Sequence, residues 1–467
     1  MRWAVLCCDG LPVSGLLTVL RNVLQLGFRE GLIELPVAAD LGFSWRPDKW
    51  EFFPHGDPAA NYPEWLTVSS WAPADWSREE LAERLTRTRD DVARLGELRP
   101  PEVAALGAGI EELAAPYERH FRDWLDTHDP DWVCAINMTL SDAVPATLAL
   151  HRAAARRWGG GRPGGVLFWD HDLFGSCSVY ENGARVYPKA PNSLTPLPGG
   201  DPGHRWVVAT DALAAEAAGY PGGPKPEVLP NLLPAPEAGP LAERHHEFLA
   251  QQRIAAGRPV LLAPVRVWRP KGADIAVSLL AELRALARAD GEQDPCLLIF
   301  GSLAEDREFA ADLAVQARRL DAWPDIRFLD GVPLVSCRDE AGAWRLDEAD
   351  LLKLAAATGG AVLFTPSQPD IDTVGLGPAL AAVAGVPCAV TPFDCFTDVY
   401  GADFARIDVD PTPAGLASAA AALRAAMCAI RRGDAGAAGA MAANARIVAE
   451  RFGDGGWRHL LTSMAAR

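Results

Sequence analysis

The chain has 467 residues, of which 49% are apolar, and it carries a formal net charge of −17. This length exceeds that of one ordinary hydrophobic core, so two or three domains are expected. The strong negative charge argues against nucleic acid or an anionic membrane surface as the main partner. Any bound phosphate must therefore be held by a few local cations.

The nine cysteines form no CxxC pair, and several of them lie inside apolar runs. This distribution is typical of buried free thiols rather than of a disulfide framework or a zinc site. The N-terminal apolar run, 2–8, is too short for a signal peptide, and no run approaches the roughly 20 apolar residues of a membrane span. We therefore expect a soluble, cytoplasmic protein without an integral membrane segment.

Short apolar runs alternate with Ala/Leu/Arg-rich stretches along most of the chain. The apolar runs are predicted to be strands: 2–8, 131–137, 165–169, 205–210, 226–229, 259–265, 296–300, 326–329, 361–366 and 387–391. The stretches between them are predicted to be helices: 14–29, 79–126, 141–158, 211–218, 272–289, 304–320, 347–357 and 375–384. The alternation predicts an α/β fold with doubly wound, largely parallel sheets.

The alternation occurs twice, and a proline-rich stretch separates the two series. Residues 230–240 contain four prolines in eleven residues, which is typical of a linker. The sequence therefore predicts two Rossmann-like domains, 1–235 and 236–445, that face each other across a ligand-binding cleft. The tail 412–467 is predicted to be mostly Ala-rich helix that either caps the second domain or crosses back to the first, with 446–467 as the helix that would cross.

Residues 42–76 interrupt this pattern with five tryptophans, among them Trp45 and Trp50, and with several prolines. The segment shows no clear period. It is either a loop packed as a small satellite core or an aromatic wall of a binding site, where tryptophan faces stack on a ring or hold a cation.

The first charged element follows the predicted strand 259–265. Arg266 and Lys271 come next, and Gly272 begins a helix. An arginine and a lysine at the carboxyl end of a buried strand can donate charge-assisted hydrogen bonds to a diphosphate. A solvated basic turn is the alternative.

The second element follows the predicted strand 361–366 and holds Asp370 and Asp372. Gly375 and Leu376 then begin an apolar helix, whose first backbone N–H groups form a ready anion site. Asp372 is placed to accept hydrogen bonds from sugar hydroxyls, although a carboxylate at this position is also typical of a plain helix N-cap.

A third element lies in the first domain, where the predicted strand 165–169 ends in Asp170, His171 and Asp172. Titratable groups at the end of a strand that faces a cleft are candidates for a functional site. A lone histidine is more often structural, but a histidine between two aspartates at such a strand end favours the functional interpretation.

These elements together resemble glycosyltransferase family 4, whose members are retaining enzymes of the GT-B fold. The resemblance rests on the Arg-x4-Lys-Gly spacing of 266–272 and on the acid-x-Phe-Gly-Leu helix start, which here runs from Asp372 to Leu376. A Gly-x-Pro entry to the next strand, 385–387, completes it. The match covers most of the chain, and no counterpart is found for residues 42–76 or for about 332–346.

The resemblance implies that domain 1–235 binds an acceptor and that domain 236–445 binds a nucleoside-diphosphate sugar. The implied diphosphate contacts are Arg266, Lys271, Gly375 and Leu376. The implied contacts to the donor sugar are Asp370, Thr373 and Val374. Catalytic roles fall to His171, Asp172 and Asp372. The nucleobase is expected at Gly331 and Val332, and the acceptor beside Ser14, Gly15, Trp45 and Trp50.

One departure from the family pattern affects the expected donor contacts. Leu380 stands eight residues after Asp372, where the family usually has a second glutamate that holds the ribose hydroxyls. Loss of a charged hydrogen-bond acceptor costs about 1.5–3 kcal/mol. The replacement of the glutamate by Leu380 therefore leaves both the donor affinity and the identity of the donor open.

The resemblance implies a retaining transferase without a cofactor or an essential metal, since the cations and the helix start can stabilise the departing diphosphate. The expected donor is a GDP or UDP sugar, and the expected acceptor is a small molecule with an oxygen or sulfur nucleophile, in secondary-metabolite assembly. The alternatives are a pseudo-glycosyltransferase or another enzyme with an atypical donor, a GT-B nucleotide-sugar epimerase, and a non-catalytic sugar-binding protein. A homodimer is left open.

Overall fold

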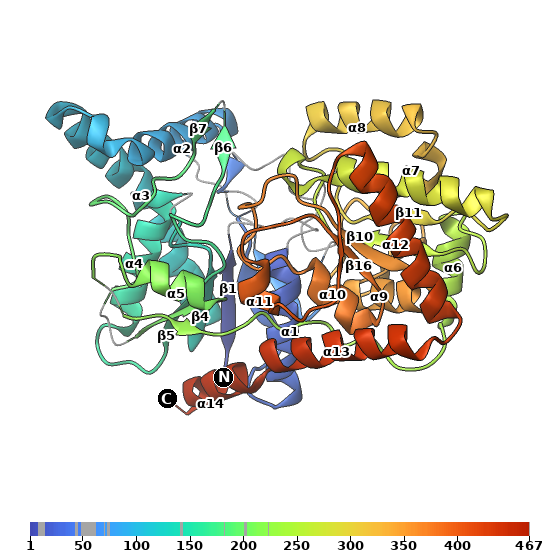
Figure 1. The fold of residues 1–467 in the computed structure, drawn as a ribbon. Helices are drawn as coiled ribbons and strands as arrows, with labels where there is room; N and C mark the ends of the chain where they lie inside the picture. The colour runs from blue at the N-terminus through green and yellow to red at the C-terminus, as the bar shows by residue number, and fades with distance from the viewer. Residues whose placement is uncertain are drawn as a thin grey trace. The chain divides into compact units, whose positions relative to one another are not determined.

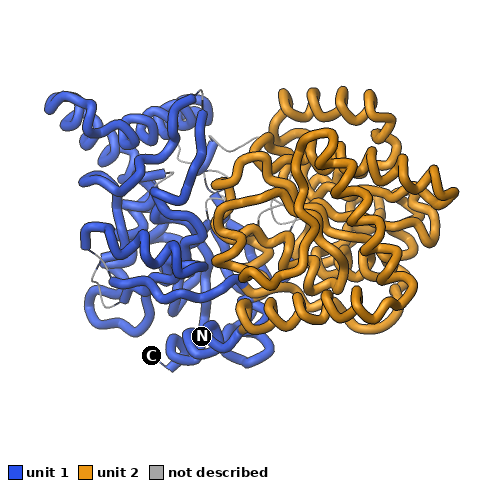
Figure 2. Tube along the Cα trace, viewed as in Figure 1, with its two compact units in different colours: residues 1–10, 23–231, 454–467 blue, residues 11–22, 232–453 orange. Residues whose placement is uncertain are grey.

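The computed structural model describes residues 1–7, 15–42, 45–47, 62–69, 71, 75–140, 143–181, 183–199, 203–222 and 224–466. The chain forms two compact units (Figure 2). Unit 1 comprises residues 1–10, 23–231 and 454–467, and unit 2 comprises residues 11–22 and 232–453. The predicted linker around 230–240 lies where the chain passes from unit 1 to unit 2.

Unit 1 is built on a seven-stranded parallel sheet in the order β3-β2-β1-β4-β5-β8-β9 (Figure 1). Its strands are β1 (Trp3–Cys7), β2 (Val37–Asp40), β3 (Leu66–Ser69), β4 (Trp132–Ile136), β5 (Gly165–Asp170), β8 (His204–Val208) and β9 (Glu227–Val228). Val5 pairs with Cys134, which pairs in turn with Leu167. Every residue of β1, β4 and β5 is buried, so both faces of the sheet are covered.

The helices of unit 1 are α2 (Arg78–Ala93), α3 (Pro100–His128), α4 (Val144–Trp158), α5 (Asp211–Ala217) and α14 (Gly455–Ala465), with a 3-10 turn η3 (Leu95–Glu97). Helix α1 (Gly15–Arg29) begins among the residues of unit 2 and ends among those of unit 1. A small hairpin joins β6 (Tyr180–Glu181) to β7 (Ala184–Arg185).

The single helix predicted over 79–126 is two helices. Helix α3 has a proline in its first turn, and the side chain of Glu102 accepts a hydrogen bond from the backbone N–H of Arg99, which caps it. A proline lacks the N–H that would continue a preceding helix, so the first helix must end before residue 100. Apolar periodicity alone did not reveal this break.

The aromatic segment 42–76 supplies the edge strand β3, which the aperiodic sequence did not predict. Trp45 is completely buried, and its indole N–H donates to Asp40 Oδ1 at 2.7 Å. The imidazole of His120 lies 2.6 Å from the other carboxylate oxygen of Asp40 and stacks on Trp71. In this structure Trp45 is therefore a packed core residue, which favours the satellite-core alternative over the binding-site wall. Trp50 lies outside the described residues.

Unit 2 is built on a six-stranded parallel sheet in the order β12-β11-β10-β15-β16-β17 (Figure 1). Its strands are β10 (Val260–Ala263), β11 (Cys296–Ile299), β12 (Ile326–Phe328), β15 (Ala361–Phe364), β16 (Cys388–Val390) and β17 (Ile407–Asp408). A separate hairpin joins β13 (Cys337–Arg338) to β14 (Trp344–Arg345). In this order β11 and β12 follow β10 on one side, whereas β16 and β17 follow β15 on the other. The switch point of the sheet therefore lies between β10 and β15.

The helices of unit 2 are α6 (Glu243–Gln251), α7 (Ala273–Ala289), α8 (Arg307–Arg319), α9 (Glu348–Ala357), α10 (Gly377–Ala384), α11 (Phe396–Tyr400), α12 (Pro413–Arg431) and α13 (Ala435–Arg451). Two 3-10 turns, η4 (Arg269–Lys271) and η5 (Trp323–Asp325), precede α7 and β12. The ten strands predicted from apolar runs all exist, whereas α6, α11 and the short strands β2, β3 and β17 were not predicted.

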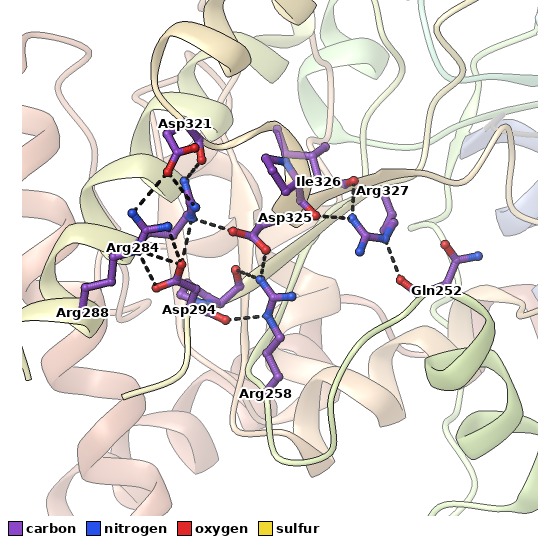
Figure 3. A network of polar contacts seen from close by, with 11 residues as sticks. Gln252, Arg258, Arg284, Arg288, Asp294, Asp321, Asp325, Ile326 and Arg327 are labelled. Carbon is purple, nitrogen blue, oxygen red and sulfur yellow. Dashed lines mark hydrogen bonds and ion pairs between the residues drawn. The ribbon is translucent and has the colours of Figure 1, made fainter. Parts of the chain in front are cut away.

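A polar network ties together the amino ends of β10, β11 and β12 (Figure 3). Asp325, directly before β12, forms an ion pair with Arg258, before β10, and another of 2.7 Å with Arg284 of α7. Asp294, before β11, pairs with Arg288 at 2.8 Å. Asp321 pairs with Arg288 at 3.2 Å, so three carboxylates balance the three arginines. The network is therefore structural, and ligand chemistry is expected at the opposite, carboxyl ends of the strands.

Helix α12 is the one described helix that is long and apolar enough to cross a membrane, by length and composition alone. Its helical form was predicted with the Ala-rich tail 412–467, but no stretch long enough to span a membrane was recognised there, because its apolar character comes largely from alanine. Helix α12 lies against α7. Arg424, in the second half of α12, and Arg431, its last residue, form ion pairs with Glu292, in the turn after α7. One helix of this kind is weak evidence for a membrane span.

The C-terminal helix α14 packs within unit 1, whereas α13 before it belongs to unit 2. The indole of Trp457 donates to the carbonyl of Pro230 at 2.8 Å, and that of Trp132 donates to the carbonyl of Met464. The eight cysteines among the described residues are all free thiols.

Candidate functional site

Two loops at the switch point of unit 2 bring the first and second charged elements together. Lys271 lies in η4, after β10, and Asp372 lies in the loop after β15. The Lys271 ammonium donates to Asp372 Oδ1 at 2.7 Å, and about four-fifths of each side chain is buried. The second oxygen of Asp372 is buried without a hydrogen-bond partner among the described residues. A cation for a phosphate and an acceptor for a hydroxyl thus lie in contact.

Hydrogen bonds between the two loops fix this juxtaposition. Ser367 donates from its backbone to the carbonyl of Pro270 at 3.0 Å and from its hydroxyl to the carbonyl of Arg269 at 2.8 Å. The Thr365 hydroxyl donates to the carbonyl of Gly272 at 2.9 Å. The backbone at Gly272 has φ of +65°, and a Cβ there would collide with the Thr365 carbonyl oxygen. Only glycine suits this junction.

Arg266, the other predicted diphosphate cation, is held by a carboxylate that the sequence did not suggest. Its Nε donates to Glu305 Oε2 at 2.8 Å, and the other oxygen of Glu305 accepts from the backbone N–H of Ser302 at 2.7 Å. Arg266, Lys271, Glu305 and Asp372 therefore carry no net charge together. A diphosphate that binds here competes with these two carboxylates for the cations.

The start of α10 provides backbone donors beside Asp372. No described group accepts a hydrogen bond from the backbone N–H of Gly375 or of Leu376. Gly375 has φ of +64°, and a Cβ there would press on the ring of Phe393 at 2.7 Å. The Tyr400 hydroxyl donates to the Gly375 carbonyl at 2.6 Å, which fixes the peptide. Both N–H groups are thus held in place for an anion.

The remaining residues predicted for the donor side differ in exposure. Asp370 is exposed and accepts from the side chain of Gln368, whereas Val374 is buried and Thr373 is half-buried. Gly331 and Val332 follow β12, and the backbone N–H of Gly331 donates to the carbonyl of Phe300 at 3.0 Å.

In unit 1, Asp170 and His171 at the end of β5 are both buried. Trp206 donates to Asp170 Oδ2 at 2.7 Å, and burial raises the pKa of Asp170 to about 7. Burial lowers the pKa of His171 to about 4, partly offset by a hydrogen bond with the Asn231 side chain. The imidazole lies against the ring of Trp169, with the centroids 4.7 Å apart. His171 is therefore neutral at physiological pH.

These two shifts act on stability in opposite directions. From pH 6.5 down to about 4, His171 is neutral in the fold and charged in the unfolded chain, so stability falls as pH falls. From pH 3.8 up to about 7, Asp170 is protonated in the fold and ionised in the unfolded chain, so stability falls as pH rises. Between about pH 4 and 6.5 the two contributions cancel.

Asn137 is a site residue that the sequence reading missed. It directly follows β4, has φ of +52°, and its side-chain oxygen accepts from the backbone N–H of His171 at 2.8 Å. Its side-chain nitrogen lies 3.5 Å from Asp172 Oδ2. A polar residue at the end of a buried strand next to β5 was the signal that could have found it. Nothing local in the sequence indicates Glu305.

The acceptor-side predictions are only partly described. Gly15 is exposed at the start of α1, and Ser14 lies outside the described residues. Among the residues that the structure describes, no group of three or more His, Cys, Asp or Glu side chains is arranged to hold a metal ion.

No protein-family model and no curated protein matches the sequence. Solved structures do match. A glycosyltransferase from Rickettsia africae has a TM-score of 0.56 at 13% identity, and the match covers 100% of this chain and 98% of that one. HepE of Anabaena, in complex with UDP-glucose, has a TM-score of 0.56 at 14% identity over 100% and 99%. Sucrose-phosphate synthase of Thermosynechococcus elongatus has a TM-score of 0.54 at 12% identity over 100% and 98%.

These similarities establish the fold. The chain is a mixed α/β protein with two Rossmann-like units of the GT-B type, as the sequence predicted, and it resembles glycosyltransferases with that fold.

Proposed function

We propose that the chain is a retaining, metal-independent hexosyltransferase that moves a sugar from a nucleoside-diphosphate sugar to a small-molecule acceptor. The contact between Lys271 and Asp372 at the switch point of unit 2 carries this proposal. A diphosphate needs the ammonium and the free N–H groups of Gly375 and Leu376, and a sugar hydroxyl needs the adjacent carboxylate. The arrangement thus suits a ligand in which a sugar is joined to a diphosphate.

A UDP sugar is the donor that we favour over a GDP sugar. HepE was solved with UDP-glucose, and a matching synthase from Burkholderia xenovorans is described as UDP-forming, with a TM-score of 0.54 at 13% identity. Fold similarity supports the donor class only as an analogy. The nucleobase is expected beside Gly331 and Val332, at the end of β12.

In the proposed reaction, the bond between the anomeric carbon and the β-phosphate oxygen breaks, and its electron pair goes to that oxygen. An acceptor oxygen or sulfur bonds to the anomeric carbon on the same face, and its proton passes to the departing phosphate oxygen. Lys271, Arg266 and the start of α10 stabilise the diphosphate as charge develops on it. Neutral His171 orients the sugar, with Asp172 beside it.

The acceptor that we propose is a small molecule with an oxygen or sulfur nucleophile, in secondary-metabolite assembly. The net charge of −17 supports a small cationic compound over a polyanion.

Incubation with UDP-glucose tests the reaction class, with water as the acceptor and NMR as the readout. The proposal predicts release of UDP together with α-glucose as the first anomer, at the same rate with and without a metal chelator. β-Glucose as the first product would contradict retention, an epimerised donor would indicate an epimerase, and loss of turnover with chelator would contradict metal independence.

An atypical donor is a second candidate, and Leu380 favours it. Its side chain is buried, with 2% of its surface exposed, in the apolar interior of α10. Because leucine has no carboxylate, this position offers no acceptor to the ribose hydroxyls. Calorimetric titration separates the two candidates, because binding of neither UDP nor GDP would reject a standard nucleoside-diphosphate donor.

A further inference from the structure

A hairpin outside the parallel sheet of unit 2 holds the loop that follows β12. Arg345, in β14, donates from Nη2 to the carbonyl of Asp330 at 3.2 Å and to that of Gly331 at 3.0 Å. Both residues have positive φ, +50° at Asp330 and +103° at Gly331, so the chain turns sharply where the guanidinium binds. One side chain thus uses two backbone acceptors of this loop.

The hairpin itself is anchored to α6. Arg338, in β13, forms an ion pair of 2.8 Å with Glu247 and stacks over the ring of Trp344, 4.6 Å from its centroid. The backbone N–H of Trp344 donates to the side chain of Gln251 at 2.9 Å. These contacts fix β14 and therefore the position from which Arg345 reaches the loop.

Part of the Arg345 guanidinium is left for a ligand. Its Nε and Nη1 donate to no residue that the structure describes. The Arg345 side chain is only partly buried. The end of β12 therefore presents a positive charge and N–H donors, while the carbonyls of Asp330 and Gly331 each already accept one hydrogen bond from Arg345.

The distance from the diphosphate elements suits a nucleobase at this loop. Strand β12 is two places from β10 in the sheet, or about 10 Å at the usual strand spacing. An extended nucleoside diphosphate with its phosphates at the end of β10 spans that distance.

Uracil and guanine differ in what they offer to such a loop. The pairing edge of uracil has two carbonyl oxygens on either side of one N–H. That of guanine has one carbonyl oxygen, one ring N–H and an amino group. A cationic donor at this loop attracts the two carbonyl oxygens of uracil, whereas guanine offers it one carbonyl oxygen beside N–H groups that the positive charge repels.

We propose that Arg345 is a specificity-determining residue that makes this loop select uracil over guanine. The inference rests on the proposed function, because it requires that a nucleoside diphosphate binds to unit 2. It assigns a role to the hairpin 337–345, which lies in the segment that has no counterpart in the family pattern.

Titration calorimetry of the full chain with UDP and with GDP tests this assignment in the wild type, Arg345→Ala and Arg345→Lys. The wild type is expected to bind UDP more tightly than GDP. In Arg345→Ala the ratio of the two dissociation constants should shift toward GDP by about tenfold, the scale of one charge-assisted hydrogen bond. Arg345→Lys keeps the charge but not the two-carbonyl contact, and should shift the ratio less.

Arg338→Ala is the matched control, because it removes an arginine of the same hairpin that does not touch the loop, while the pairing of β13 with β14 and the contact of Trp344 with Gln251 still hold β14 in place. Its UDP-to-GDP ratio should stay within about twofold of the wild type, the usual scatter for a residue outside the contact. Three outcomes would overturn this inference but not the proposed function. They are an unchanged UDP-to-GDP ratio in Arg345→Ala, an equal shift of the ratio in both alanine variants, and a wild type that prefers GDP. A wild type that binds neither nucleotide would overturn the proposed function with it.

Discussion

Substitution of Asp372 by asparagine should separate two roles that this carboxylate has in the proposed donor site. In the structure Asp372 neutralises Lys271 across 2.7 Å. Asparagine removes the charge that competes with a diphosphate for Lys271, so UDP should bind more tightly, by about 1 kcal/mol or a factor of about five. Transfer from UDP-glucose should nevertheless fall, because the sugar loses its charged acceptor.

The partner substitution Lys271→Met gives the matching effect on stability. It leaves Asp372 largely buried and without its cation, which costs about 3 kcal/mol, the lower end of the range for buried pairs, since about a fifth of each side chain is exposed. For a unit of this size that lowers the melting temperature by about 6–12 °C. The double variant Lys271→Met/Asp372→Asn should recover most of the loss.

Chemical denaturation measures the unfolding free energies of the four proteins, and calorimetry measures UDP affinity. The reasoning fails if the double variant is as unstable as Lys271→Met, because the two side chains would then not be coupled. It also fails if Asp372→Asn binds UDP no better than the wild type.

Three further predictions concern the strand end in unit 1 and the loop junction in unit 2. His171→Ala should reduce turnover by about 100-fold with UDP affinity within about twofold; unimpaired transfer in steady-state assays would remove His171 from the mechanism. Asp170→Asn removes the titration that opposes that of His171. The unfolding free energy of this variant should therefore rise by about 3 kcal/mol between pH 4 and pH 6.5, as His171 in the unfolded chain loses its charge. A pH dependence of the unfolding free energy equal to the wild type's would contradict this. Gly272→Ala should be destabilised by several kcal/mol through its clash with Thr365, while Gly342→Ala, with φ of +78° and open space around it, should lose only about 1–2 kcal/mol; similar melting temperatures for the two would show that the clash is relieved.

The sequence predicted the strand ends that carry the candidate site, because buried parallel strands read as continuous apolar runs and the charged residues follow them directly. Arg266, Lys271 and Asp372 were found in this way. The same logic located His171, and it would have located Asn137 had the strand predicted over 131–137 been ended at Ile136, as in the structure.

Contacts between distant residues could not be predicted. Glu305 lies in a different loop from Arg266, and only the fold brings the two side chains into contact. The hairpin that carries Arg345 has two-residue strands without a period, so neither its form nor its contact with Gly331 has a sequence signal. The short strands β2 and β3 were missed for the same reason.

The position of Leu380 limits how far the family pattern can be carried over. An introduced glutamate would enter a buried apolar environment, where an unpaired carboxylate is costly. We expect Leu380→Glu to lower stability without strengthening UDP binding, as thermal unfolding and calorimetry can show; tighter UDP binding would mean that the side chain reaches the ribose.

A crystal structure of the chain with UDP tests the central claim most directly. The account predicts the β-phosphate within hydrogen-bonding distance of Lys271 Nζ and of the N–H groups of Gly375 and Leu376, with the contact between Lys271 and Asp372 broken. UDP bound elsewhere, or bound while that ion pair stays at 2.7 Å, would contradict it.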